Sequence, residues 1–104
     1  MPHPPDAIFA TEDFTALGAI KELKERNINI PGDFGVIGFA NEQFGEHITP
    51  TLSTVDQQTI QMGKSALNLL LDFIEKRGEA RSGVQKIVLE PKLIYRQSSD
   101  KTLI

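Results

Sequence analysis

The chain has 104 residues, of which 39% are hydrophobic and 24% are charged, and these fractions are typical of one soluble globular domain. Its formal net charge of -3 argues against a nucleic-acid-binding surface, which needs clustered lysine and arginine to neutralise phosphates. The sequence contains no cysteine, which excludes disulfides, thiolate nucleophiles and cysteine-based metal sites.

The first third of the chain predicts a strand, a helix and a second strand. Residues 7–10 form a short apolar run, typical of a strand that is covered on both faces. Asp13 is expected to cap a helix over residues 13–26, because the apolar residues that follow recur on one helical face, and Asn27 is a suitable stop. Residues 34–39 form a second apolar run. A strand–helix–strand unit of this spacing predicts two parallel, nearly adjacent strands.

Residues 40–53 predict a long loop, because they show no periodicity and contain glycine, proline and several polar groups. Loops of that length inside a compact domain are usually functional. A brief extended piece is expected at residues 53–55.

The last part of the chain predicts a long helix and two short strands. Residues 58–77 carry an apolar stripe at helical spacing, which is more typical of a buried core than of a partner-binding surface. Residues 85–90 and 92–96 are strand candidates separated by a proline that cannot donate a ladder hydrogen bond. The polar residues 97–104 are expected to be frayed.

Polar side chains follow both of the first two predicted strands, at the edge where open α/β sheets bind ligands. Glu12 either accepts hydrogen bonds from ligand hydroxyls or merely complements the dipole of the helix that follows it. Asn41 is either a ligand contact, because an amide both donates and accepts, or an ordinary turn residue. Asp13 is mainly structural, and we include it because it lies next to this edge.

Three segments together carry a resemblance to a known family: Asp6–Gly18 (DAIFATEDFTALG), Pro31–Asn41 (PGDFGVIGFAN) and Thr49–Gln57 (TPTLSTVDQ). Over residues 5–99 the chain resembles the C-terminal part of the effector-binding domain of LacI/GalR-type transcriptional regulators. The resemblance implies an α/β fold like that of periplasmic binding proteins, in which two Rossmann-like subdomains flank a ligand cleft. This chain would supply part of one parallel sheet and the segments that cross between the subdomains.

The resemblance also implies a division of the chain. Residues 1–48 would belong to the C-terminal subdomain and residues 49–57 would cross the hinge between the subdomains. Residues 58–84 would supply a helix of the N-terminal subdomain, and residues 85–104 would cross back and form the last strand of the C-terminal subdomain. Contact with DNA would then come only through a headpiece that this sequence does not contain. The resemblance further implies a cytoplasmic protein that forms a homodimer. Sheet edges and an apolar helix stripe that this chain leaves uncovered separately favour a swapped oligomer.

Two positions depart from the family's usual pattern. Family members usually carry an aspartate where this chain has Ala40, and commonly an asparagine where it has Glu12. Either the carboxylate has moved from one strand end to the other, or the ligand is recognised in a different way. Gln57 either makes hydrogen bonds across the hinge, as the resemblance suggests, or simply begins the second helix. The predicted ligand-binding residues are therefore Glu12, Asp13, Ala40, Asn41 and Gln57.

Other kinds of chemistry find little support in the sequence. His3 and His47 lie far apart, and neither has a second ligand at metal spacing. No serine stands in a nucleophile elbow, and there is no glycine-rich phosphate cradle. The N-terminal residues lack the features of a secretory signal, and the longest apolar cluster is too short to span a bilayer. We expect no metal, no cofactor, no membrane partner and no enzyme activity.

The leading hypothesis is an effector-sensing module of a transcriptional regulator that binds a small metabolite, a sugar or a sugar derivative. An alternative is the C-terminal part of a periplasmic sugar-binding protein that serves a transporter. A third class is a sugar-modifying enzyme on an α/β scaffold.

Overall fold

The computed structural model describes residues 4–75 and 86–103. The chain divides into two compact units, one formed by Met1–Asp56 with Lys92–Ile104 and the other by Gln57–Pro91. The predicted end of the second helix at residue 77 and the predicted boundary between residues 84 and 85 lie outside the described residues.

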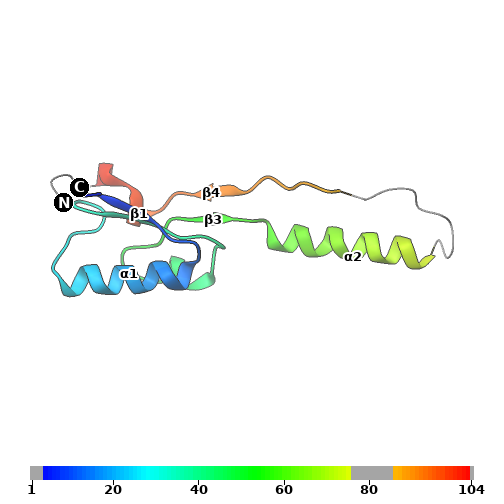
Figure 1. Ribbon diagram of the computed structural model, residues 1–104, viewed down its shortest axis with the longest axis horizontal. Helices are drawn as coiled ribbons and strands as arrows, with labels where there is room; N and C mark the ends of the chain where they lie inside the picture. Colours follow the sequence, from blue (N-terminus) through cyan, green and yellow to red (C-terminus); the bar gives the residue numbers. More distant parts are fainter. Residues whose placement is uncertain (1–3, 76–85, 104) are drawn as a thin grey trace. The chain divides into compact units, whose positions relative to one another are not determined.

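The first unit contains the predicted strand–helix–strand motif (Figure 1). Strands β1 (Ala7–Phe9) and β2 (Gly35–Ile37) pair in parallel, with Ile8 opposite Val36. Helix α1 (Asp13–Glu25) connects them, and Asn27 directly beyond it adopts φ 58°, as expected of a helix stop. The predicted parallel pairing is thus confirmed. The small core joins both strands, α1 and the segment before the next strand; its buried members are Ala10, Ala16, Ile20, Val36 and Leu52.

The prediction that residues 7–10 are covered on both faces is wrong for β1. Ile8 is 41% exposed and Phe9 is 58% exposed, and only the following residue, Ala10, is buried. In the part of the chain that the structure describes, the sheet that contains β1 has two strands. Among the described residues β1 is therefore an edge strand, whereas Val36 in the middle of β2 is fully buried.

The second sheet pairs β3 (Thr54–Asp56) with β4 (Lys92–Ile94) in antiparallel register, with Thr54 opposite Ile94. An isolated parallel bridge between Ile37 and Ser53 links β3 to the end of β2. The predicted strand over residues 85–90 is not formed in its described part. Gln58, which immediately precedes the next helix, adopts φ 58°, and its side-chain amide donates to the Glu90 carbonyl at 2.5 Å.

The loop over residues 40–53 is more regular than predicted, because it contains the short 3-10 helix η1 (Gln43–Glu46). The rings of Phe44 and Phe14 lie 4.9 Å apart and hold η1 against the start of α1.

The prediction that residues 97–104 are frayed is wrong for the described part of that segment. It forms two short 3-10 helices, η2 (Gln97–Ser99) and η3 (Lys101–Leu103). The Ser98 hydroxyl donates to the Val36 carbonyl at 2.5 Å and accepts from the Ser53 N–H at 2.8 Å. A small buried hydroxyl thus ties the segment to both β2 and β3, which polar composition alone does not reveal.

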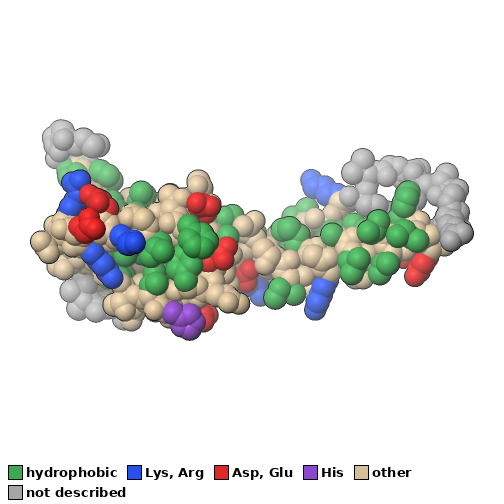
Figure 2. Space-filling model, turned by 90° about the horizontal axis from the view of Figure 1, so that it is seen from below, with side chains coloured by type: hydrophobic (Ala, Val, Ile, Leu, Met, Phe, Trp, Pro, Cys, Tyr) green, Lys and Arg blue, Asp and Glu red, His purple; other side chains and the backbone are tan. Residues whose placement is uncertain are grey.

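The second unit contains helix α2 (Thr59–Glu75) and the described residues 86–91. None of the helix residues is buried, so the predicted core role of its apolar stripe is not realised in this chain. The large exposed side chains of the helix are Ile60, Met62, Leu67, Leu70, Leu71, Phe73 and Ile74. Figure 2 shows apolar side chains gathered along this helix. In the described part of the chain, no helix is long and apolar enough to cross a membrane.

Candidate functional site

The carboxyl ends of β1 and β2 meet at one edge of the parallel sheet, which is where open α/β folds bind ligands. Glu12 lies between β1 and α1, and Ala40 and Asn41 follow β2. The two connections are joined directly, because the Glu42 N–H donates to the Asp13 carboxylate at 2.6 Å. The structure therefore brings four of the five predicted residues to the same edge. Gln57 follows β3 and opens the second unit, and its part in the site stays a prediction.

Asp13 supports this edge rather than capping the helix, so the predicted cap is wrong. The N-cap residue is Glu12, and Asp13 is the first helical residue. The Asp13 side chain is buried, and its other oxygen accepts from the Thr54 hydroxyl at 2.8 Å. A Cβ at Gly38 would overlap the Asp13 carboxylate, so this close approach requires a glycine there. Both carboxylate oxygens are thus engaged within the protein, and direct contact of Asp13 with a ligand stays a prediction.

Glu12 has an exposed side chain at the same edge. Its Oε1 accepts from the Thr15 hydroxyl at 2.9 Å, and its carbonyl accepts from the Ala16 N–H at the start of α1. Glu12 makes no side-chain cap hydrogen bond to the helix backbone. The carboxylate therefore keeps acceptor capacity on the solvent side, which suits a ligand that offers hydroxyl donors.

Ala40 and Asn41 form a tight turn with left-handed backbone at both residues, with φ 102° and 53°. Such backbone costs an L-residue about 1–3 kcal/mol and persists only where the surroundings hold it in place. Here the Ala40 N–H donates to the Val55 carbonyl at 2.9 Å and the Asn41 N–H donates to the Thr54 hydroxyl at 3.1 Å. Strand β3 therefore dictates this turn.

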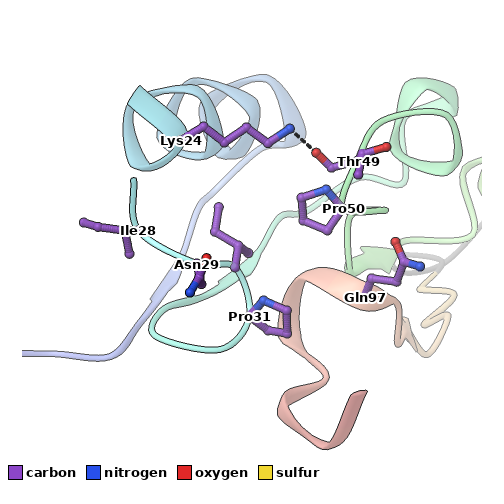
Figure 3. Close-up of a pocket in the computed structure, with 8 residues that line it drawn as sticks. Lys24, Ile28, Asn29, Pro31, Thr49, Pro50 and Gln97 are labelled. Carbon is purple, nitrogen blue, oxygen red and sulfur yellow. Dashed lines mark hydrogen bonds between the residues drawn. The ribbon is translucent and has the colours of Figure 1, made fainter. Parts of the chain in front are cut away.

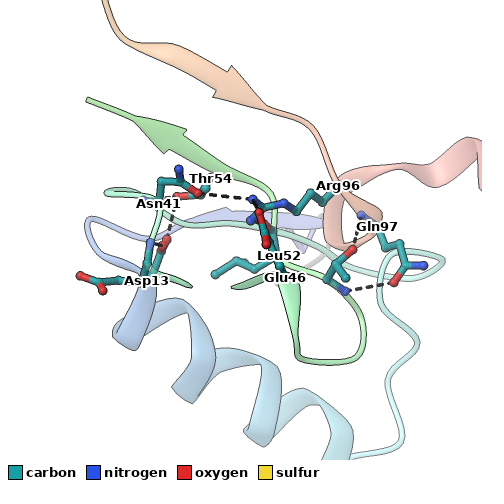
Figure 4. A network of polar contacts seen from close by, with 9 residues as sticks. Asp13, Asn41, Glu46, Leu52, Thr54, Arg96 and Gln97 are labelled. Carbon is teal, nitrogen blue, oxygen red and sulfur yellow. Dashed lines mark hydrogen bonds and ion pairs between the residues drawn. The ribbon is translucent and has the colours of Figure 1, made fainter. Parts of the chain in front are cut away.

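Sequence reasoning missed Arg96, which contacts the same turn from the end of β4 (Figure 4). Its guanidinium donates to the Leu52 carbonyl at 3.0 Å, to Asn41 Oδ1 at 3.4 Å and to the Glu46 carboxylate at 3.3 Å. The only available signal was an arginine at the end of a strand candidate, and that signal does not indicate which residues the arginine contacts.

A separate hollow of about 410 Å³ lies at the opposite edge of the parallel sheet (Figure 3). It is lined by the C-terminal end of α1, by residues that precede β2 and β3, and by Gln97. Its lining includes Pro31 and Pro50, with the amides of Asn29 and Gln97, and none of the predicted ligand-binding residues. Lys24 Nζ closes one side by donating to the Thr49 carbonyl. Among the described residues, no group of three or more His, Cys, Asp and Glu side chains could hold a metal ion.

Residues 1–99 match the family described as the periplasmic binding protein-like domain, and the chain belongs to this family. Within it, similar proteins include LacI-type transcriptional regulators, as the three sequence segments indicated. The PurR repressor of Haemophilus influenzae Rd is 34% identical over 94 residues, and that of Escherichia coli O139:H28 is 37% identical over 98 residues. These matches cover 90% and 93% of this chain but 28% of each relative. The chain thus spans less than a third of the length of these curated relatives.

Solved structures agree with this assignment. A LacI-family regulator of Sanguibacter keddieii superposes with a TM-score of 0.86 at 32% identity, covering 94% of this chain and 36% of that one. The CelR–cellobiose complex has a TM-score of 0.79 at 35% identity, covering 89% and 28%. A LacI-family regulator of Enterococcus faecium with bound ribose has a TM-score of 0.81 at 29% identity, covering 93% and 35%. The predicted α/β, periplasmic-binding-protein-like fold is confirmed, and the curated relatives are regulators rather than enzymes.

Proposed function

We propose that this chain forms part of the effector cleft of a LacI-type transcriptional regulator and that the effector is a sugar or a sugar derivative. The observation that carries the proposal is the hydrogen bond between the Glu42 N–H and Asp13, because it joins the two connections that carry Glu12 and Asn41. A carboxylate and an amide at one edge can together accept from and donate to a hydroxyl-rich ligand. Cellobiose and ribose in two of the neighbouring structures support the choice of a sugar.

The proposed mechanism follows from the connections between the two units. Strands β3 and β4 lead to and from the second unit, which contains α2. In the proposed regulator, residues 1–48 belong to one subdomain, residues 49–57 and the start of 85–104 cross the hinge, and residues 58–84 belong to the other subdomain. The effector would favour one arrangement of the two subdomains over another. It can do so only if it binds the two arrangements with different affinities. The protein would act in the cytoplasm as a dimer, with DNA contacted by a separate headpiece.

The rival function is that of a periplasmic sugar-binding protein. The reading frame upstream of this sequence separates the two, because a helix-turn-helix segment supports the regulator and a secretory signal supports the transport protein. The names of the curated relatives favour the regulator.

A thermal-shift screen of the complete gene product against D-ribose, cellobiose and a panel of related sugars tests the ligand class. A ligand present at a hundred times its dissociation constant stabilises the folded state by about 2.7 kcal/mol. We expect at least one sugar to raise the unfolding temperature and Glu12→Gln to reduce that rise. A rise with non-sugar metabolites alone would reject the sugar and keep the regulator.

A further inference from the structure

The turn that carries Asn41 is held on one side by a largely buried guanidinium. The Arg96 side chain is 14% exposed, and it donates to three groups along the loop over residues 40–53: those of Asn41, Glu46 and Leu52. Gly45 makes room for it, because a Cβ at that position would lie 3.0 Å from Arg96 Nη1. Arg96 therefore joins the end of β4 to the turn after β2.

This contact fixes how the Asn41 amide can be used. A guanidinium has five N–H donors and no acceptor, so the atom of Asn41 that faces Arg96 must be the oxygen. The amide nitrogen then carries two N–H donors, and within the described residues neither has a hydrogen-bond partner. Asn41 is half-buried, so a ligand can reach this nitrogen, and the nitrogen can only donate hydrogen bonds to it.

We infer that Arg96 is a positioning residue for effector recognition, acting through Asn41. The inference rests on the proposed function, and it sharpens the ligand class. The effector presents an acceptor oxygen to the Asn41 amide and a hydroxyl donor to the Glu12 carboxylate, as neighbouring oxygens of a polyol can do. Arg96 itself does not touch the effector.

Calorimetry on the complete gene product, with D-ribose and cellobiose as probes, tests this role. A neutral hydrogen bond is worth about 0.5–1.5 kcal/mol, so Asn41→Ala and Arg96→Lys should each weaken binding about three- to tenfold. Because Arg96 acts through Asn41, the double variant should bind no more weakly than Asn41→Ala alone. Glu46→Gln is the matched control, since its amide oxygen still accepts from Arg96, and its affinity should stay within about twofold. Unchanged affinity in Arg96→Lys, or multiplied losses in the double variant, would overturn the inference.

A ligand-free measurement separates this inference from the proposed function. In nitrogen-15 NMR of the 104-residue chain, Arg96→Lys should increase the mobility of the Asn41 side-chain amide. The Asn41 backbone N–H, which donates to Thr54, should be unaffected. If no sugar of the thermal-shift panel binds, the sugar proposal fails, and this measurement still decides the role of Arg96. If Arg96→Lys does not fold, the test uses Asn41→Ala instead, and the rate at which the Arg96 guanidinium rotates is measured by NMR. Faster rotation than in the unchanged chain supports the contact between Arg96 and Asn41, and an unchanged rate refutes it.

Discussion

Replacing Thr54 by valine should destabilise the first unit more than any other change of similar size at the candidate site. The Thr54 side chain is fully buried, and its hydroxyl donates to Asp13 while accepting from the Asn41 N–H. Valine has nearly the same shape and can do neither. Losing a hydrogen bond to a charged group costs about 1.5–3 kcal/mol, and an orphaned N–H costs about 1–3 kcal/mol. Since Asn41 is only half-buried, the second loss is about 1 kcal/mol, and we expect a total of about 2.5–4 kcal/mol.

Amide hydrogen exchange measures this loss of stability specifically in the first unit of the chain. The Ala10 N–H donates to the Ile37 carbonyl at 2.8 Å and therefore reports on opening of the parallel sheet. At about 1.4 kcal/mol per factor of ten, its protection in Thr54→Val should fall by about two to three orders of magnitude. Urea unfolding should show a midpoint lower by about 1 M or more, for a slope of about 1–3 kcal/mol per molar.

Thr54→Ser is the matched control, because serine keeps the hydroxyl and loses only a methyl group, worth about 0.8 kcal/mol. Equal protection of the Ala10 N–H in the two variants would refute the reasoning. The Thr54 hydroxyl would then contribute nothing to the stability of the buried Asp13 carboxylate.

Four further predictions concern neighbouring residues and the second unit. Gly38→Ala should cost about 1–3 kcal/mol of stability by urea unfolding, because its methyl group overlaps the Asp13 carboxylate; an unchanged midpoint would mean that Asp13 lies elsewhere. Ala40→Gly should instead stabilise the chain by about 1 kcal/mol in the same assay, because relief of the φ 102° backbone outweighs the greater entropy of unfolded glycine. Glu12→Gln in the complete gene product should weaken effector binding by about tenfold or more by calorimetry, as expected for a hydrogen bond to a charged group; unchanged affinity would leave Glu12 as a helix-start residue only. The 104-residue chain should self-associate in light scattering through the exposed apolar side chains of α2, and a monomer from micromolar to millimolar concentration would contradict this.

Local patterns were sufficient to predict the βαβ unit. The apolar runs, the helical stripe and Asn27 each act within a few residues, so their signals are legible without tertiary structure. The same patterns indicate which residues favour burial, but they do not show whether the chain supplies a covering layer. For this reason β1 and α2 were correctly predicted as elements while their burial was not.

The polar contacts of the site were beyond sequence reasoning for a different cause. Arg96 and Asn41 are 55 residues apart, and Thr54 and Asp13 are 41 residues apart. Such pairs meet only once the register of β3 against β2 and β4 is set, and no short-range pattern determines that register. Small hydroxyl residues such as Ser98 are also hard to place from sequence. Serine favours loops whether or not its side chain is buried, so the burial of Ser98 leaves no sequence signal.

The position of the site and its support therefore have separate origins. The ends of β1 and β2 place Glu12 and Asn41 at one edge, as the topology of a parallel pair requires. The shape of the turn at Ala40 and Asn41 comes instead from Thr54 and Val55 of β3 and from Arg96 after β4. These are the two strands that lead to and from the second unit. A change in the path of β3 or β4 must alter the hydrogen bonds that hold the turn, so the segments expected to cross the hinge also set the geometry with which the edge meets a ligand.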